Sequence, residues 1–249
     1  MRTLVMGDIH GAYKAMIQCL ERSGFDYEND CLIQLGDITD GYPEVYECVE
    51  LLLKIKHLIA LKGNHDDWFN DFIKTEFHPA YWNFGGKGTL ISYLDHANKS
   101  GCLFPSGSGY KSGLESKDVP DSHRIFFDAQ KLYYIDQSQR CFVHAGFDCS
   151  LSFFEQDEEN YYWDRTLWTD ALSHFEDQEG SAMHTIFKEI YIGHTPTIKY
   201  GSDEPLKIFN IQNMDTGAGH SGRLSIMDID TKEFWQSDPT SNLYKENHR

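Results

Sequence analysis

The sequence lacks several features that would assign it to common classes of protein. Its six cysteines include no Cys-x-x-Cys pair, and no Pro-, Gly- or Ser-rich tract divides its 249 residues. It also has no apolar run approaching the roughly 20 residues that cross a membrane. Cysteines scattered through apolar stretches are typical of free thiols in a reducing compartment. We therefore predict one soluble domain over 1–249, in the cytoplasm and without a targeting segment.

Positive charge is also scarce. The chain has 22 lysines and arginines against 39 aspartates and glutamates, which makes its formal net charge −17. Proteins that follow a nucleic-acid backbone need Lys and Arg to replace condensed counterions. We therefore expect neither a nucleic-acid duplex nor a membrane as partner. A phosphorylated substrate would need local positive charge, which bound divalent cations can supply.

Three short phrases rich in Gly, Asp, Asn and His stand out in the first quarter of the chain. They are Gly7-Asp8-Ile9-His10-Gly11, Gly36-Asp37-Ile38-Thr39-Asp40-Gly41 and Gly63-Asn64-His65-Asp66. Each follows a short apolar run, and α/β sheets place ligand sites at the carboxyl ends of their strands. Carboxylate, amide and imidazole groups are ligands of divalent cations. The pattern therefore predicts a metal site.

The coarse order of elements supports an α/β fold. Helical spacing over 13–22 and 43–56 separates apolar runs at 3–6, 31–35 and 58–61, which indicates βαβαβ units. Residues 95–124 are polar and rich in turn residues, and we expect a loop or an insertion there. The remainder is predicted to be largely β, with strands at 132–135, 140–143, 189–192, 207–211 and 224–228, and a C-terminal hairpin over about 222–237. Two of these strands end at His144 and His194.

The order of these motifs, with His-Ala-Gly at 144–146 and Gly-His-Thr at 193–195, resembles the calcineurin-like metallophosphoesterases. Within them it is similar to the phosphoprotein phosphatase group, which includes bacterial and phage serine/threonine phosphatases and symmetrical diadenosine tetraphosphate hydrolases. The resemblance spans residues 7 to about 217. It implies a four-layer αββα sandwich of two mixed sheets flanked by helices, with a dinuclear metal site at the strand ends.

Carried over position by position, the resemblance implies roles for individual residues. The implied metal ligands are Asp8, His10, the bridging Asp37, Asn64, His144 and His194. His65 would protonate the leaving alcohol and Asp40 would orient it, while Arg165 and Asn64 would bind the substrate phosphate. The cofactor would be two divalent ions. We expect manganese, with iron or zinc as alternatives, because these donor groups accept all three.

Other roles stay open for several of these residues. His65 could instead be a structural histidine beside a ligand, and Asp40 could cap the 43–56 helix. Arg165 could form an ion pair with the acidic run 155–159. The segment 82–86 resembles the Trp/Asn-Gly-Gly segment of the bacterial branch. We expect it either to form a wall of the site or to belong to the hydrophobic core. Asp215-Thr216-Gly217 matches the aspartic-protease triplet, but only one copy is present, so we expect a structural turn with His220 close behind it.

One position departs from the family pattern. The second phrase usually continues Asp-Arg-Gly, and its arginine helps to bind phosphate, but here Gly41 follows Asp40. Loss of such a charge-assisted contact would weaken monoester binding about tenfold or would mark a different substrate. Lys87 and Lys111 are candidates to compensate.

These observations predict a metal-dependent phosphoesterase in which a metal-bridging hydroxide attacks phosphorus directly. A serine/threonine protein phosphatase is the favoured activity, with a phosphorylated protein or a small phosphoester as substrate. A dinucleoside polyphosphate or other nucleotide hydrolase is the alternative within enzymes. A non-catalytic binding module on the same fold is the alternative outside them. The sequence does not determine the oligomeric state.

Overall fold

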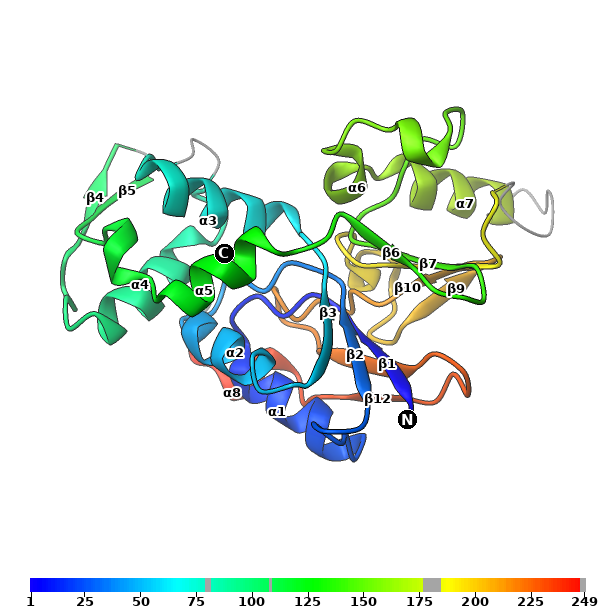
Figure 1. Cartoon of the computed structure of the whole chain (residues 1–249), viewed down its shortest axis with the longest axis horizontal. Helices are drawn as coiled ribbons and strands as arrows, with labels where there is room; N and C mark the ends of the chain where they lie inside the picture. The colour runs from blue at the N-terminus through cyan, green and yellow to red at the C-terminus, as the bar shows by residue number, and fades with distance from the viewer. Residues whose placement is uncertain (79–81, 108, 177–184, 247–249) are drawn as a thin grey trace.

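Two five-stranded sheets form the centre of the computed structural model, which describes residues 1–78, 82–107, 109–176 and 185–246 (Figure 1). In spatial order, the first sheet consists of β12 (Phe234–Gln236), β11 (Ser225–Asp228), β1 (Thr3–Met6), β2 (Cys31–Gln34) and β3 (His57–Ala60). The second consists of β6 (Tyr133–Ile135), β7 (Arg140–Val143), β8 (Glu189–Ile192), β10 (Ile211–Asn213) and β9 (Leu206–Ile208).

Both sheets are mixed. Strands β1, β2 and β3 run parallel, and β11 and β12 extend the first sheet in antiparallel fashion. In the second sheet β7, β8 and β10 run parallel, with β6 and β9 antiparallel at the edges. Neighbouring parallel strands need a crossover, and in the first sheet helices supply it.

The central strands bury side chains on both of their faces. In β1, Leu4 and Met6 pack into the core beneath the helices, whereas Val5 faces the other sheet. In β7, Phe142 faces the first sheet, whereas Cys141 and Val143 pack toward the outer helices. Strands covered on both faces read as continuous apolar runs, which is why these segments showed no polar alternation in the sequence.

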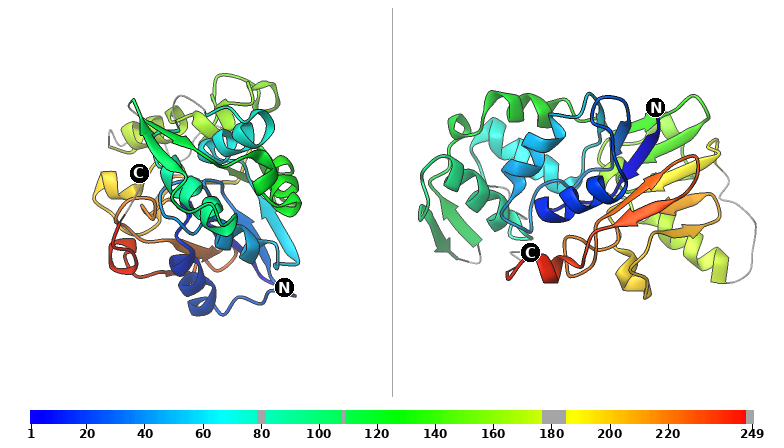
Figure 2. Two further views of the ribbon diagram at one scale, coloured as in Figure 1. Left: turned by 90° about the vertical axis from the view of Figure 1, so that its left-hand side faces the viewer. Right: turned by 90° about the horizontal axis from the view of Figure 1, so that it is seen from below.

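Helices cover the outer face of each sheet (Figures 1 and 2). Helices α1 (Tyr13–Arg22) and α2 (Val45–Leu52) contribute to the core of the first sheet, and the short α8 (Thr240–Leu243) contacts α1. Helices α6 (Asn160–Trp163) and α7 (Thr166–Glu176) pack on the second sheet. The resulting order of helix, sheet, sheet and helix confirms the predicted four-layer αββα architecture.

A helical lobe beside the first sheet contains the stretch predicted as a polar loop. The lobe comprises α3 (Asn64–Thr75), α4 (Gly86–His96), β4 (Leu103–Ser106), β5 (Gly109–Ser112), a 3₁₀ turn η1 (Ser116–Asp118) and α5 (Asp121–Asp128). Residues 95–124 were predicted as a loop or an insertion, and the first of these alternatives is wrong for most of that range. Lys99 ties the stretch together by ion pairs with Glu115 (2.9 Å) and Asp118 (2.7 Å), and Leu114 and Val119 are buried.

Two predicted element boundaries also differ. Helix α2 begins at Val45, after the N-cap Glu44, so Pro43 lies outside it. The single strand predicted over 207–211 is two antiparallel strands, β9 and β10, because Phe209 between them has a positive φ of 51° that turns the chain. Across the described ranges, each helix is too short or too polar to span a bilayer.

Candidate metal centre and its cavity

The predicted ligand residues converge where strands of the two sheets end. Asp8 and His10 follow β1, Asp37 follows β2, and Asn64 opens α3 just beyond β3. The second sheet contributes His144, which directly follows β7, and His194, which lies two residues beyond the end of β8. All six side chains are buried, with at most 4% of their surface exposed. The structure thus brings the whole predicted ligand set together in one place.

Backbone strain accompanies this convergence. His10, Asp37, Asp40 and His194 all have positive φ values, between 51° and 69°. Non-glycine residues in this region cost of order 1–3 kcal/mol each and persist only where the surroundings impose them. Close approach is also needed at Gly63, where a Cβ atom would lie 2.1 Å from Asp37 Oδ1. The loops at the strand ends therefore hold their side chains in positions that local preference does not favour.

Two histidines are oriented for metal binding by backbone carbonyl groups. His10 Nδ1 lies 3.0 Å from Thr39 O, and His144 Nδ1 lies 2.8 Å from Leu35 O. Because a carbonyl oxygen can only accept, each Nδ1 donates and each Nε2 is left with its lone pair toward the site. The two Nε2 atoms lie 3.5 and 3.4 Å from opposite oxygens of Asp37.

Asp37 is thus placed between two groups of donor atoms. One group is His10, Asp37 and His65, and the other is Asp37, His144 and His194; in each group the candidate ligand atoms lie within 4.8 Å of one another. Asn64 Oδ1 lies 3.3 Å from His144 Nε2 and so faces the second group. A carboxylate shared by two clusters is the arrangement that a pair of divalent cations requires.

Asp8 lies outside both groups, yet its environment fits a cation. Its Oδ2 accepts a hydrogen bond from the His194 amide at 2.9 Å. Among the residues that the structure describes, neither its Oδ1 nor the Nε2 atom of His194 has a hydrogen-bond partner, and both atoms are buried. A buried polar atom without a partner costs about 1–3 kcal/mol, and coordination to a metal ion would remove that penalty. The donor set therefore fits the two divalent cations implied by the motifs.

The buried charges shift one another's protonation. Burial raises the pKa of Asp37, but nearby histidines outweigh it and hold that pKa well below its usual value. Burial lowers the pKa of His144, but Asp37 and Asp8 reverse this and raise it to about 9. Burial together with Asp215 raises the pKa of Asp8. Cations would favour the ionised carboxylates and the neutral imidazoles, which are the forms that bind metal.

His65 and Asp40 form a buried pair beside the centre. His65 Nδ1 lies 2.7 Å from Asp40 Oδ2, and the other carboxylate oxygen accepts from Trp82 Nε1 (2.9 Å) and Thr89 Oγ1 (2.7 Å). Asp40 does not cap α2, whose N-cap is Glu44. Trp82 belongs to the hydrophobic core of the first sheet, and its hydrogen bond to Asp40 also helps to position that carboxylate.

Asp66 is a supporting residue to which the sequence reasoning gave no role. Its Oδ1 accepts from the amides of Ile38 (2.9 Å) and Thr39 (3.1 Å). Its Oδ2 accepts from the Gly63 amide (3.2 Å) and from Gln130 Nε2 (2.9 Å). Asp66 thereby joins the second phrase to the third. Its place at the end of the Gly-Asn-His-Asp phrase was the only signal that pointed to it.

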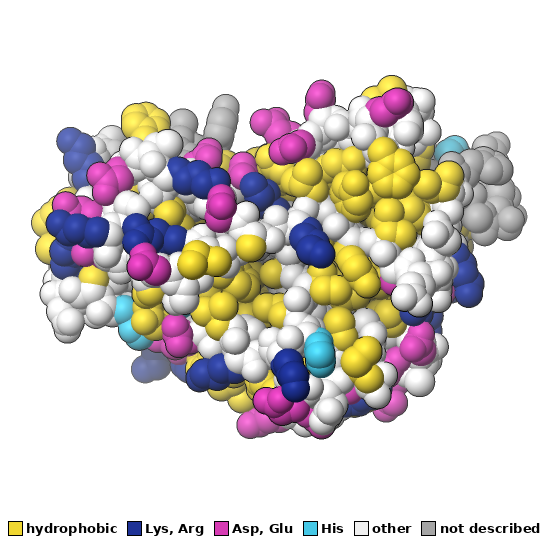
Figure 3. Space-filling view, viewed as in Figure 1, with side chains coloured by type: hydrophobic (Ala, Val, Ile, Leu, Met, Phe, Trp, Pro, Cys, Tyr) yellow, Lys and Arg dark blue, Asp and Glu magenta, His cyan; other side chains and the backbone are white. Residues whose placement is uncertain are grey.

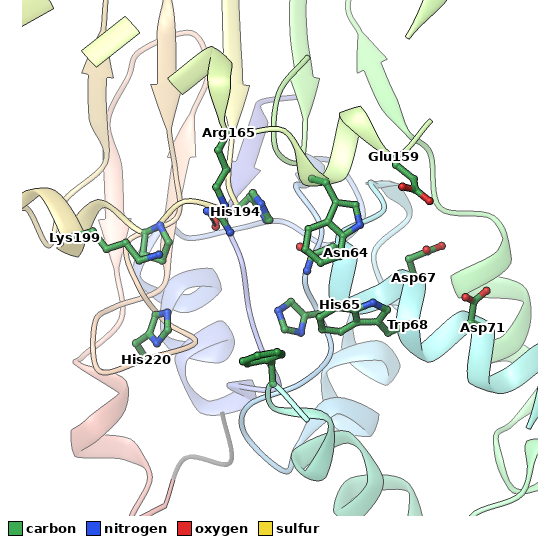
Figure 4. Close-up of a pocket in the computed structure, with 13 residues that line it drawn as sticks. Asn64, His65, Asp67, Trp68, Asp71, Glu159, Arg165, His194, Lys199 and His220 are labelled. Carbon is green, nitrogen blue, oxygen red and sulfur yellow. Dashed lines mark hydrogen bonds between the residues drawn. The ribbon is translucent and has the colours of Figure 1, made fainter. Parts of the chain in front are cut away.

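A cavity of about 880 Å³ opens above the centre (Figure 4). Asn64, His65 and His194 lie at its base, and its wall carries three aromatic side chains, Trp68, Phe84 and Trp163. Figure 4 shows two charged sides. Lys199 and His220 lie on one side, and Asp67, Asp71 and Glu159 lie on the other.

Arg165 lines the same cavity, close to His194. Its Nη1 donates to His194 O at 3.1 Å and to Thr195 Oγ1 at 2.8 Å. Its guanidinium makes no ion pair with the acidic run 155–159, all of which the structure describes. Arg165 is therefore placed beside the candidate metal centre, where its remaining N–H groups can meet an anion.

The two lysines considered as substitutes for the missing arginine lie elsewhere. Lys87 Nζ lies 5.6 Å from the centre of the Tyr110 ring, and Lys111 belongs to β5; neither lines the cavity. Gly41 has a φ of 91°, a conformation that favours glycine. The Asp215 side chain stabilises its own turn, since Oδ1 accepts from the Gly217 amide at 3.0 Å.

Comparison with known proteins agrees with this geometry. A family model described as calcineurin-like phosphoesterase matches residues 1–223. The chain is 24% identical over 226 residues to serine/threonine-protein phosphatase 1 of Salmonella typhimurium, covering 90% of each protein. It is 27% identical over 150 residues to a symmetrical bis(5'-nucleosyl)-tetraphosphatase of Pseudomonas putida, covering 59% of this chain and 42% of that one. A crystal structure of a provisionally assigned diadenosine tetraphosphatase shares its fold, with a TM-score of 0.65, 15% identity and coverage of 96% and 93%.

Proposed function

The chain belongs to the calcineurin-like phosphoesterase family, and from this premise we propose that it removes phosphate from phosphoserine and phosphothreonine in proteins. As a family member it is a metal-dependent phosphoester hydrolase. The observation that carries the substrate proposal is the extent of the similarity. The Salmonella protein phosphatase aligns over 90% of its length, whereas the Pseudomonas tetraphosphatase aligns over 42% of its own.

The residues at the base of the cavity suit this reaction. When bound, two divalent cations supply positive charge for the phosphoryl group and lower the pKa of water. We propose that Asp8, His10, Asp37, Asn64, His144 and His194 hold them and that manganese is the metal used. Asp37 would serve both ions, because each of its oxygens faces a different histidine.

His65 is our proposed general acid. Its Nδ1 is held 2.7 Å from Asp40, so Nε2 is the atom that can give a proton to the leaving alcohol oxygen. Asp40 fixes the orientation of the ring and stabilises its protonated form, and Trp82 and Thr89 hold Asp40 in turn. After transfer, the leaving group departs as the neutral alcohol of serine or threonine.

Arg165 and Asn64 are our proposed phosphate ligands. One nitrogen of the Arg165 guanidinium donates to the His194 carbonyl oxygen and to the Thr195 hydroxyl. Because Arg165 lines the cavity, its other N–H groups can bind an anion there. A guanidinium can bind two phosphate oxygens at once. Asn64 presents a neutral amide and so adds no further negative charge to a site that must accept an anion.

A second candidate, hydrolysis of dinucleoside polyphosphates, has one specific observation in its favour. The aromatic side chains Trp68 and Trp163 lie together in the cavity wall, with ring centres 5.5 Å apart, and Phe84 lies in the same wall with 61% of its surface exposed. Such surfaces can stack a nucleobase. They can equally pack against a peptide.

Purified protein loaded with manganese separates these candidates. We expect turnover of phosphoserine and phosphothreonine peptides to exceed turnover of diadenosine tetraphosphate, with para-nitrophenyl phosphate as a general substrate. The Asp37→Asn variant, purified in parallel, controls for contaminating phosphatases. Preference for the dinucleotide by orders of magnitude would refute the protein phosphatase proposal. Binding of substrate without turnover under any metal would indicate a binding module instead.

A further inference from the structure

The cavity above the metal centre is divided by charge (Figure 4). Its acidic side consists of Asp67 and Asp71 on α3 and Glu159 just before α6. Its basic side carries Lys199 and His220, which come from the second half of the chain. The proposed acid His65 and the proposed metal ligand His194 lie between the two sides in Figure 4. A substrate bound at the base would therefore have differently charged surfaces on its two flanks.

Each basic-side residue stands on a backbone segment that is held in place. Lys199 belongs to a 3₁₀ turn, η3 (Thr197–Tyr200), which starts three residues after His194. The turn is fixed by the Thr197 amide, which donates to Asp215 O at 2.8 Å, and by Thr197 Oγ1, which donates to Ser202 O at 2.9 Å. The position of Lys199 is thus tied to the strand end that carries a proposed metal ligand.

His220 is held from the opposite end of the sequence. Its carbonyl oxygen accepts a hydrogen bond from the Tyr42 hydroxyl at 2.7 Å. The Tyr42 ring is 1% exposed and stacks on Tyr244, with ring centres 4.3 Å apart. These contacts use the backbone of His220, and its side chain lines the cavity.

This arrangement lies next to the position where the family arginine is missing. Gly41 replaces that arginine, and the next residue, Tyr42, is the one that anchors His220. The second phrase therefore lacks that cation, and the residue after Gly41 contacts the backbone of a residue on the basic side. Lys199 then supplies a full positive charge there, and His220 supplies a ring N–H donor.

We propose that Lys199 and His220 form a second anion subsite, which binds an acidic side chain or a second phosphate next to the phosphorylated residue of a peptide substrate. The inference rests on the proposed protein phosphatase activity and adds to it a preference for acidic sequence around the target residue. Negative charge on the opposite flank of a substrate would instead meet Asp67, Asp71 and Glu159.

The test compares three phosphoserine peptides that differ at the flanking positions: one with glutamates, one with glutamines and one with a second phosphoserine. Measured with the manganese-loaded protein, kcat/KM should be higher for both anionic peptides than for the glutamine peptide. In the double variant Lys199→Gln, His220→Gln this preference should fall about tenfold, as expected for loss of charge-assisted hydrogen bonds. The glutamate peptide tests an acidic side chain as the bound anion, and the peptide with two phosphoserines tests a second phosphate.

Two further variants make the result specific. Lys87→Gln removes the same charge from a lysine outside the cavity, and it should leave the preference unchanged. Tyr42→Phe deletes the hydroxyl that anchors His220 and should lower the preference by a smaller factor, while its turnover of the glutamine peptide stays close to that of the wild type. Raising the salt concentration to about 0.5 M should weaken the preference in the wild type and have little effect in the double variant.

An unchanged preference in the double variant, or an equal loss for all three peptides, would overturn the subsite. Failure of the proposed function is recognised separately, as hydrolysis of para-nitrophenyl phosphate or dinucleotide without hydrolysis of any peptide. In that case the same peptides, with a phosphonate in place of the phosphate, serve as inhibitors of nitrophenyl phosphate hydrolysis. Equal inhibition by the glutamate and glutamine versions would then refute the subsite as well.

Discussion

The base of the cavity and its rim are built in different ways. The base consists of side chains at strand ends that are at most 4% exposed, and two of them, His10 and His144, are hydrogen-bonded to backbone carbonyl groups. The rim consists of side chains on helices and turns, such as Lys199 and Asp71, that are largely exposed. Groups that must hold cations in fixed geometry need a rigid setting. Groups that contact only the outer part of a substrate can vary without disturbing the chemistry.

The two regions also differ in what they do to stability. The base contains strained residues, such as His10 and Asp37, and a buried Asp8 oxygen without a partner. The backbone strain is a cost that the surrounding fold must offset. The cost of the Asp8 oxygen would be removed by a bound cation. The rim carries ordinary surface charges, which contribute little to folding. We therefore expect changes at the base to affect activity and stability together, and changes at the rim to affect selectivity alone.

Metal removal should have the largest effect. A chelator should abolish turnover, by about 10³-fold or more, because the cations supply several kcal/mol of transition-state stabilisation. It should also lower the melting temperature by about 10–20 °C, since each of two metals present at about 100 times its dissociation constant adds about 2.7 kcal/mol. Calorimetry with and without manganese measures this. A melting temperature that does not respond to chelation would remove the link between the base and stability.

Substitution of the proposed acid should come next. His65→Asn should lower kcat for phosphoserine peptides about 10²- to 10³-fold, and lower it less than tenfold for para-nitrophenyl phosphate, whose leaving group needs no proton. The Asp40→Asn variant should show the same difference between substrates in weaker form, because Asp40 acts through His65. Equal losses on both substrates would exclude His65 as the acid.

Arg165 lies between base and rim, and its substitution sharpens the boundary between them. Arg165→Ala should raise KM for all phosphoesters about tenfold and leave the melting temperature unchanged, since the side chain is exposed and makes no buried ion pair. Arg165→Lys should restore part of the loss, because lysine keeps the charge but not the fork. Steady-state kinetics would decide; an unaltered KM would place Arg165 outside the phosphate site.

A substitution on the acidic side of the rim should have the smallest effect on activity. Burial and the neighbouring Asp67 raise the pKa of Asp71, which marks a carboxylate in a negatively charged setting. Asp71→Asn should lower kcat/KM for a peptide with flanking lysines about two- to fivefold, the range of an exposed charge pair. Turnover of the glutamine peptide provides the reference. An equal loss of kcat/KM for both peptides would indicate that Asp71 affects the shape of the cavity and does not interact with the charge of the peptide.

Prediction from the sequence worked best where short-range patterns and motifs agree. The bounds of β1, α1, β7 and β8 match the predicted ranges, because each is a compact apolar or helical pattern bounded by turn residues. For 95–124 the loop alternative was wrong, because the polar composition concealed a hairpin and short helices stabilised by Lys99 and by two buried side chains. Ion pairs between distant residues leave no local periodicity. The family roles of the site residues stay predictions.

The sequence by itself determined the base of this site. Each proposed ligand stands in a short phrase after a strand, and the parallel strands of the two sheets bring those phrases together, so local order was sufficient. Only the tertiary structure decided the rim. Lys199, His220 and the acidic trio come from separate elements, and Tyr42 reaches His220 across 178 positions of chain. Their proximity results from how the two sheets and the helical lobe pack, which no local pattern encodes.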